Sequence, residues 1–202
     1  METNQNLFEH EQFSKLTSDL GRCEEHLDSA DCQFWRRAYI RTAFSIFEAM
    51  NNFLKEKAAQ AASSGDKTAF NTTRIDLLAD YTYHIERNGK IVPQEQRFPF
   101  LNYTAFVLRS LCEESYVKAN FFSDNGWNEF QKAVQIRHRL THPKMGADLD
   151  VSDTEIQSIK EAMHWYGNAV VHGFSNREFW TEPQNFQSNA AADDRTATPY
   201  ES

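Results

Sequence analysis

Apolar residues recur at three- and four-residue spacings along most of the chain, which is the period of an amphipathic helix. The pattern predicts a first, short helix over residues 4–20, ending at Gly21. A second and longest helix is predicted over residues 31–63, where neither glycine nor proline interrupts the period. After a stretch of small and polar residues, the pattern predicts a further helix over residues 71–88.

The middle of the chain contains a break in this pattern. Gly89, Pro93 and Pro99 lie within residues 88–100. Because proline removes an amide donor and clashes with the preceding turn, we expect a long connecting loop there. Helical spacing resumes over residues 101–120.

Two more helices are predicted in the second half. One begins near Trp127 and reaches His142, because Pro143 disfavours helical geometry in the residue before it. The other begins at the sequence SDTE, residues 152–155, which has the spacing of a capping box. Its apolar period runs towards Trp180.

Composition favours the same fold class. The chain has 16 Phe but only 7 Gly and 5 Pro in 202 residues, so it has bulky side chains for a core and few helix breakers. We therefore expect an all-α fold, an antiparallel bundle of four to five main helices, forming one domain over residues 1–180. The polar stretch at 181–202 has no period and is predicted to be a disordered tail.

Charge and cysteine content narrow the functional classes. The formal net charge of −8 argues against a protein that is basic overall and binds nucleic acid with its whole surface. Cys23, Cys32 and Cys112 form an odd set without a CxxC pair, so we expect no disulfide framework, metal site or cofactor. No segment has the apolar length of a membrane span, and we expect a cytoplasmic protein with no membrane partner.

One segment departs from the acidic average. Between Trp127 and Lys144 there are four cationic side chains and one carboxylate, that of Glu129. The cations are Lys132, Arg137, Arg139 and Lys144. Salt screens distant carboxylates beyond about 8 Å at physiological ionic strength, so this basic segment can attract phosphate locally.

Arg137 and His142 within this segment have complementary chemistry. A guanidinium can clamp phosphate oxygens through two hydrogen bonds, and an imidazole can exchange protons near neutral pH. Cleavage of RNA through its own 2′-hydroxyl needs both abilities and no metal ion. On an uninterrupted helix, however, residues five apart diverge by about 140°. The pair therefore needs Pro143, a second subunit, or both, to converge.

The spacing of Arg137 and His142, R-x4-H followed by proline at the end of a helix and ahead of one last helix, resembles the HEPN superfamily. Members of that family are helical domains, commonly dimeric, whose Arg and His form a metal-independent ribonuclease site at the dimer interface. The resemblance implies an RNA endonuclease that acts as a toxin or antiphage-defence effector. It also implies a homodimer and an antitoxin or regulatory protein as possible partners.

The same resemblance assigns roles to individual residues. Arg137 and His142 take the catalytic positions, and His138 stands where the family most often has Asn. We expect substrate contacts from four residues: Arg41, His138, Arg139 and Lys144. The helix predicted over 31–63 resembles the arginine-bearing early helix of such domains, and its Arg37, Arg41 and Glu48 are candidates to line or brace the cleft.

Two other interpretations stay open. Basic residues at a helix end often only satisfy the last carbonyl groups, and a HEPN-like domain without catalysis could bind a protein or nucleic-acid partner. His138 and His142 also have the i, i+4 spacing of a zinc pair, but HRLTH lacks the glutamate of HExxH, and we expect no metal.

Overall fold

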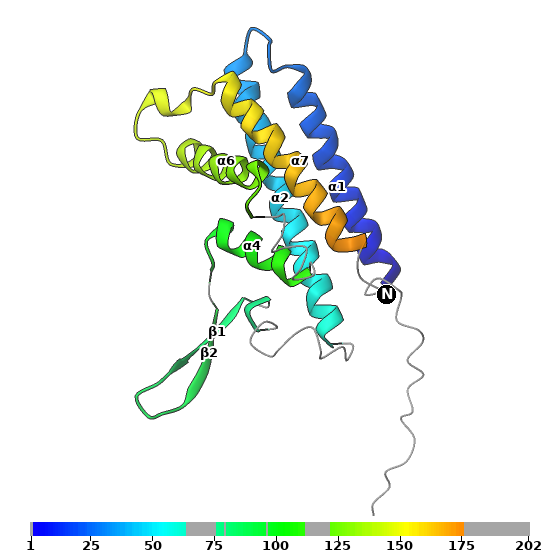
Figure 1. The fold of residues 1–202 in the computed structure, drawn as a ribbon, viewed down its shortest axis with the longest axis vertical. Helices are drawn as coiled ribbons and strands as arrows, with labels where there is room; N and C mark the ends of the chain where they lie inside the picture. The colour runs from blue at the N-terminus through cyan, green and yellow to red at the C-terminus, as the bar shows by residue number, and fades with distance from the viewer. Residues whose placement is uncertain (1, 64–75, 79, 96, 112–121, 176–202) are drawn as a thin grey trace, which may run out of the picture.

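The structure, a computed structural model, describes residues 2–63, 76–78, 80–95, 97–111 and 122–175. It is mostly helical, as predicted, with one small sheet of two strands (Figure 1).

The first two helices form an antiparallel pair. Helix α1 (Glu2–Glu25) and helix α2 (Cys32–Ser63) run side by side in opposite directions (Figure 1). The bounds predicted for α2 are confirmed. Helix α1 is longer than predicted and continues through Gly21, because a glycine inside a helix costs only about 1 kcal/mol and does not end it.

Helices α6 (Asn125–Thr141) and α7 (Asp153–Ser175) pack against each other and were both predicted. The side chain of Asp124 caps α6 by accepting a hydrogen bond from the amide of Gly126 at 2.9 Å. The capping box of α7 is confirmed in both directions. The amide of Ser152 donates to Oε2 of Glu155 at 2.9 Å, and the amide of Glu155 donates to the Ser152 hydroxyl at 3.3 Å.

Where the structure describes them, the helix predicted over 71–88 is confirmed only at residues 76–78, and the loop predicted over 88–100 is confirmed at 88–90 and 97–99 but wrong at 91–95. Strand β1 (Tyr81–Ile85) pairs with strand β2 (Ile91–Glu95) in an antiparallel hairpin that projects from the helices (Figure 1). Helical geometry occurs at residues 76–78 and is not continued through Asp80, whose φ is +58°. Residues 71–75 lie outside the described part.

The hairpin turn explains the error. Gly89 has a φ of +81°, a conformation that glycine adopts without strain, and its amide donates to the carbonyl of Glu86 at 2.8 Å. The side chain of Asn88 accepts from the amide of Lys90, also at 2.8 Å. An Asn-Gly pair between apolar runs is a strong hairpin signal, and it outweighs the weak helical period of the flanking residues.

Helix α4 (Phe100–Leu111) confirms the first half of the helix predicted over 101–120. The rest of that helix, the extension of α7 towards Trp180 and the tail predicted at 181–202 lie outside the described residues.

Aromatic rings from α2, α4, α6 and α7 meet in the core around Phe130, which is fully buried. Its ring centroid lies 5.1–6.1 Å from those of Phe47, Phe100, Trp127, Trp165 and Tyr166. Such contacts add to the burial of large apolar surfaces, so α6 is held by the whole core along one face.

A buried polar chain crosses the same core. The hydroxyl of Tyr166 donates to Asn51 at 2.7 Å, and Asn51 donates to the hydroxyl of Thr104 at 2.7 Å. Burial raises the pKa of the Tyr166 hydroxyl well above its ordinary value, so the hydroxyl keeps its proton and remains a donor. This chain links α7, α2 and α4, and buried polar groups paired in this way specify one arrangement of the helices.

The close approach of α6 and α7 gives a stability prediction. A Cβ atom at Gly126 would lie 2.6 Å from both Cβ and Cγ of Trp165, too close for any rotamer change to relieve. We expect Gly126→Ala to lower the free energy of unfolding by about 1–3 kcal/mol, measured by urea denaturation.

Gly167→Ala on α7 is the matched control, because nothing lies within 4 Å of an added Cβ there. It should leave stability unchanged or raise it by up to about 1 kcal/mol through helix propensity. Equal stability of the two variants would contradict the packing described for Gly126.

Candidate functional site

A surface pocket of about 680 Å³ lies at the carboxyl end of α6. Its walls come from α2, from the start of α4, from α6 and from the segment that follows α6. The lining residues are Phe44, Pro99, Phe100, Leu101, Val134, Gln135, Arg137, His138, Arg139, His142, Lys144 and Asp148. Three of the four cationic residues singled out in the sequence, Arg137, Arg139 and Lys144, therefore share one pocket with His138 and His142.

Arg137 is held against α2 from two sides. Its Nη2 donates to Oε1 of Glu48 at 3.0 Å, and its Cζ lies 5.8 Å from the ring centroid of Phe44. The side chains of Arg137 and Glu48 are 40% and 47% exposed, so this ion pair adds little stability. It fixes the direction of the guanidinium instead, and among the described residues it engages only one of the nitrogens that could bind an anion.

His142 leaves the helical path at the point where Pro143 follows it. It is the C-cap of α6, with φ −127° and ψ 59°, and its amide donates to the carbonyl of His138 at 3.0 Å. The φ of −127° differs from the helical value and turns the His142 side chain away from the direction it would take on an uninterrupted helix. Both Arg137 and His142 line the pocket in a single chain.

His138 lies one helical turn before His142 and faces the same pocket. The centroids of the two imidazole rings are 5.0 Å apart, and the ring planes are inclined by 55°. Both side chains are exposed to solvent. The family resemblance left the role of His138 open, and the pocket brings it next to the predicted catalytic histidine.

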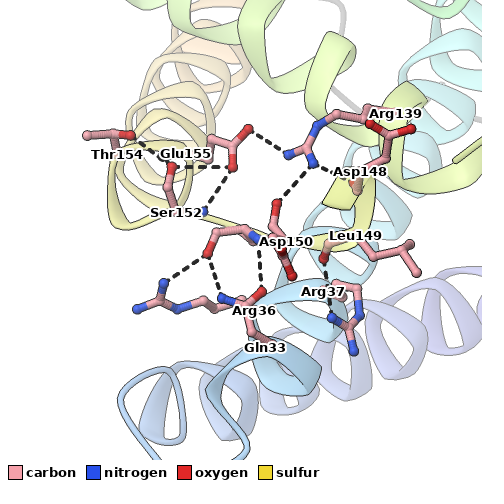
Figure 2. A network of polar contacts seen from close by, with 11 residues as sticks. Gln33, Arg36, Arg37, Arg139, Asp148, Leu149, Asp150, Ser152, Thr154 and Glu155 are labelled. Atoms are coloured by element: carbon pink, nitrogen blue, oxygen red, sulfur yellow. Dashed lines mark hydrogen bonds and ion pairs between the residues drawn. The ribbon is translucent and has the colours of Figure 1, made fainter. Parts of the chain in front are cut away.

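The segment between α6 and α7 forms one wall of the pocket and is tied to α2 (Figure 2). Gln33 and Arg36 both donate to the carbonyl of Val151, at 3.0 and 2.9 Å, and Gln33 also accepts from the Val151 amide at 2.8 Å. Arg37 donates to the carbonyl of Leu149 at 3.2 Å. These side chains satisfy backbone groups of the segment that carries Lys144 and Asp148.

Arg139, predicted as a substrate contact, anchors this segment from the other side (Figure 2). Its guanidinium donates to the carbonyls of Asp148 and Asp150, the latter at 2.9 Å, and pairs with Glu155 at 2.6 Å. Its side chain is only 29% exposed. The guanidinium is therefore occupied by its own chain, although the residue borders the pocket.

Asp148 closes the turn that follows Pro143. Its Oδ2 accepts from the amides of Lys144 and Met145, at 2.7 and 2.9 Å. These two backbone hydrogen bonds, more than the nearby cations, hold the pKa of the Asp148 carboxyl below its ordinary value. The turn keeps Lys144 at the rim of the pocket, where its side chain is exposed.

The remaining predicted residues are placed as follows. Glu48 braces Arg137, whereas Arg37 binds the backbone of Leu149. Arg41 is exposed on α2 and does not line the pocket. Neither Phe44 nor the segment Pro99–Leu101 was predicted to line a site, because they reach the pocket only through the packing of α2 and α4 around α6.

Within the described residues, no cluster of three or more His, Cys, Asp or Glu side chains is arranged to hold a metal ion. None of the described helices is both long and apolar enough to cross a bilayer.

Comparisons of the chain with protein-family models, with curated proteins and with solved structures find no match.

The contacts of Arg139 predict a structural role. Arg139→Met keeps most of the aliphatic stem and removes the donors to two carbonyls and to Glu155. We expect a loss of about 2 kcal/mol in the free energy of unfolding, because the part-buried carbonyl of Asp148, the carbonyl of Asp150 and the half-buried Glu155 carboxylate lose their shared partner.

Lys160→Met is the comparison variant. Lys160 pairs with Glu24 at 2.6 Å on a more exposed surface, and its loss should cost less than about 1 kcal/mol. If Arg139→Met were no more destabilising than Lys160→Met, the anchoring role of Arg139 would be wrong.

The turn around Asp148 predicts a titration. A carboxyl whose pKa is lowered in the folded state stabilises that state at pH values above the ordinary pKa, and this contribution is lost as the pH falls through the lowered value. We expect the Asp148 side-chain carbon to titrate in NMR with a midpoint below 3.8, the ordinary value. The amides of Lys144 and Met145 should shift with the same midpoint. A midpoint at or above 3.8 would show that the two hydrogen bonds are not formed.

Proposed function

We propose that this chain is a metal-independent endoribonuclease of HEPN type, in which Arg137 binds the scissile phosphate and His142 transfers protons. The observation that carries the proposal is that Arg137, His138, His142 and Lys144 line one pocket. A guanidinium, an ammonium and two imidazoles in one pocket are the groups that bind a phosphodiester and move protons around it.

The electrostatics of the pocket support an anionic substrate. Arg137, Arg139 and Lys144 outnumber Asp148, the one carboxylate among the lining residues. Arg139 is engaged by its own chain, so Arg137 and Lys144 supply the positive field. At physiological salt this local field acts over about 8 Å, which is enough to attract phosphate to a protein of net charge −8.

The reaction needs no group beyond the chain and the RNA. The 2′-oxygen of a ribose attacks the adjacent phosphorus and loses its proton to a base, while the bond to the 5′-oxygen breaks and that oxygen gains a proton. The products are a 2′,3′-cyclic phosphate and a 5′-hydroxyl. Arg137 faces the charge that develops on the non-bridging oxygens, where a positioned cation lowers the barrier.

The proposal also covers the arrangement of the helices and the assembly of two chains. The helices described form a HEPN-like bundle, and two chains associate so that their pockets lie at the subunit interface. In this proposal the enzyme acts as a toxin or antiphage-defence effector, controlled by an antitoxin or another regulatory protein. A homodimer is expected from light scattering.

The decisive measurement is cleavage of a mixed-sequence RNA by the full chain in the presence of EDTA. We expect Arg137→Ala and His142→Ala each to reduce the rate by about 100-fold or more, because phosphate charge or proton transfer is lost. Circular dichroism and thermal unfolding should show that both variants remain folded, since the exposed Arg137–Glu48 pair contributes little stability.

Matched controls are Arg22→Ala on α1 and His164→Ala on α7, which remove the same side-chain types from exposed positions outside the pocket. Both should cleave at the wild-type rate. Full activity in the Arg137 and His142 variants would sink the proposal. RNA binding that depends on Arg137 but yields no cleavage products would replace it with a non-catalytic interaction module.

A further inference from the structure

The exposed imidazoles of His138 and His142 share the pocket, but the proposed reaction assigns proton transfer to His142 alone. The rings of His138 and His142 lie 5.0 Å apart between centroids, inclined by 55°, and both side chains line the pocket. The hydrogen bond from the His142 amide to the His138 carbonyl, 3.0 Å, ties the two residues together at the end of α6. The backbone therefore sets the separation of the two residues.

The chemistry of RNA cleavage requires two proton transfers at two different oxygens. The 2′-oxygen must lose a proton as it attacks, and the departing 5′-oxygen must gain one. Both oxygens are bonded to the same phosphorus, so they are only a few ångströms apart. One imidazole cannot be proton acceptor and proton donor in the same step, but two neighbouring imidazoles in opposite protonation states can.

We propose that His138 is the general base and His142 the general acid of a two-histidine pair, an inference that rests on the proposed ribonuclease function. Neutral His138 accepts the proton of the 2′-hydroxyl as the new bond to phosphorus forms. Protonated His142 donates its proton to the 5′-oxygen as the old bond breaks. One proton enters the pair and one leaves it, so the charge of the pair is unchanged.

The position of each residue on α6 supports this division. His142 is the C-cap, at the end of the helix where the last carbonyls make a negative potential that favours a cation. His138 lies in the last turn of α6, four residues before that C-cap and between Arg137 and Arg139 in sequence, so positive charge flanks it on both sides. The charged groups that share the pocket with the pair are Arg137, Arg139, Lys144 and Asp148.

The test uses two RNA substrates that differ at one atom. In the second substrate a sulfur replaces the bridging 5′-oxygen at the cleavage site, and the thiolate that departs needs no proton. With ordinary RNA, we expect His138→Ala and His142→Ala each to slow single-turnover cleavage by about 100-fold or more. With the sulfur substrate, His142→Ala should recover to within about tenfold of the wild type, whereas His138→Ala should remain slow.

Arg137→Ala is the matched control, because phosphate binding is needed for both substrates and the variant should be slow with both. His138→Gln keeps a polar side chain at this exposed helical position and should cleave both substrates as slowly as His138→Ala does. Agreement between the two variants would show that the loss of activity does not come from a folding defect. Unfolding curves should show that all variants remain folded.

Failure of this inference and failure of the proposed function give different results. No cleavage of either substrate by the wild-type chain would remove the proposed function and this inference with it. Wild-type activity that is unchanged in the His138 variants, or sulfur rescue of His138→Ala instead of His142→Ala, would overturn the inference while the ribonuclease stands.

Discussion

The pocket depends on how the backbone carbonyls of the segment between α6 and α7 are satisfied. This segment is short and largely exposed, and a few side chains supply its donors: Arg139 from α6, and Gln33, Arg36 and Arg37 from α2 (Figure 2). Because these donors come from two helices, the segment cannot move without breaking contacts to both. The wall of the pocket that carries Lys144 and Asp148 is thus fixed by contacts that do not themselves face a ligand.

Helix α6 connects the core to the pocket. Its buried face carries Phe130, Ala133, Ile136 and Leu140, and the aromatic cluster around Phe130 holds that face in place. The same helix carries Arg137 and His138 at less buried positions, so the side chains proposed to act on RNA stand on a helix that the core holds in place. Groups on a rigid element lose less freedom when they bind a ligand.

The carboxylates around the pocket are paired with neighbouring groups of the chain. The chain is acidic overall, yet its cations gather where α6 ends, and the carboxylates there are used internally: Glu48 orients Arg137, Glu155 pairs with Arg139, and Asp148 accepts two backbone amides. Each of these acids fixes a neighbour in position. A basic pocket on an acidic protein therefore comes from local pairing, and the net charge of −8 does not describe it.

The sequence by itself determined the helices whose signals are local. The long uninterrupted period of α2, the capping box of α7 and Pro143 after α6 each act within a few residues, and the structure has these helices where they were predicted. The sequence also singled out Arg137, His138 and His142. The β1–β2 hairpin also had a local signal, the Asn88-Gly89 pair, which the helical period obscured. Tertiary structure alone decided the bracing of Arg137 by Phe44 and the diversion of Arg139 to its own backbone. Guanidinium contacts depend on partners that folding brings together, and a periodic pattern carries no information about which residue a side chain will meet.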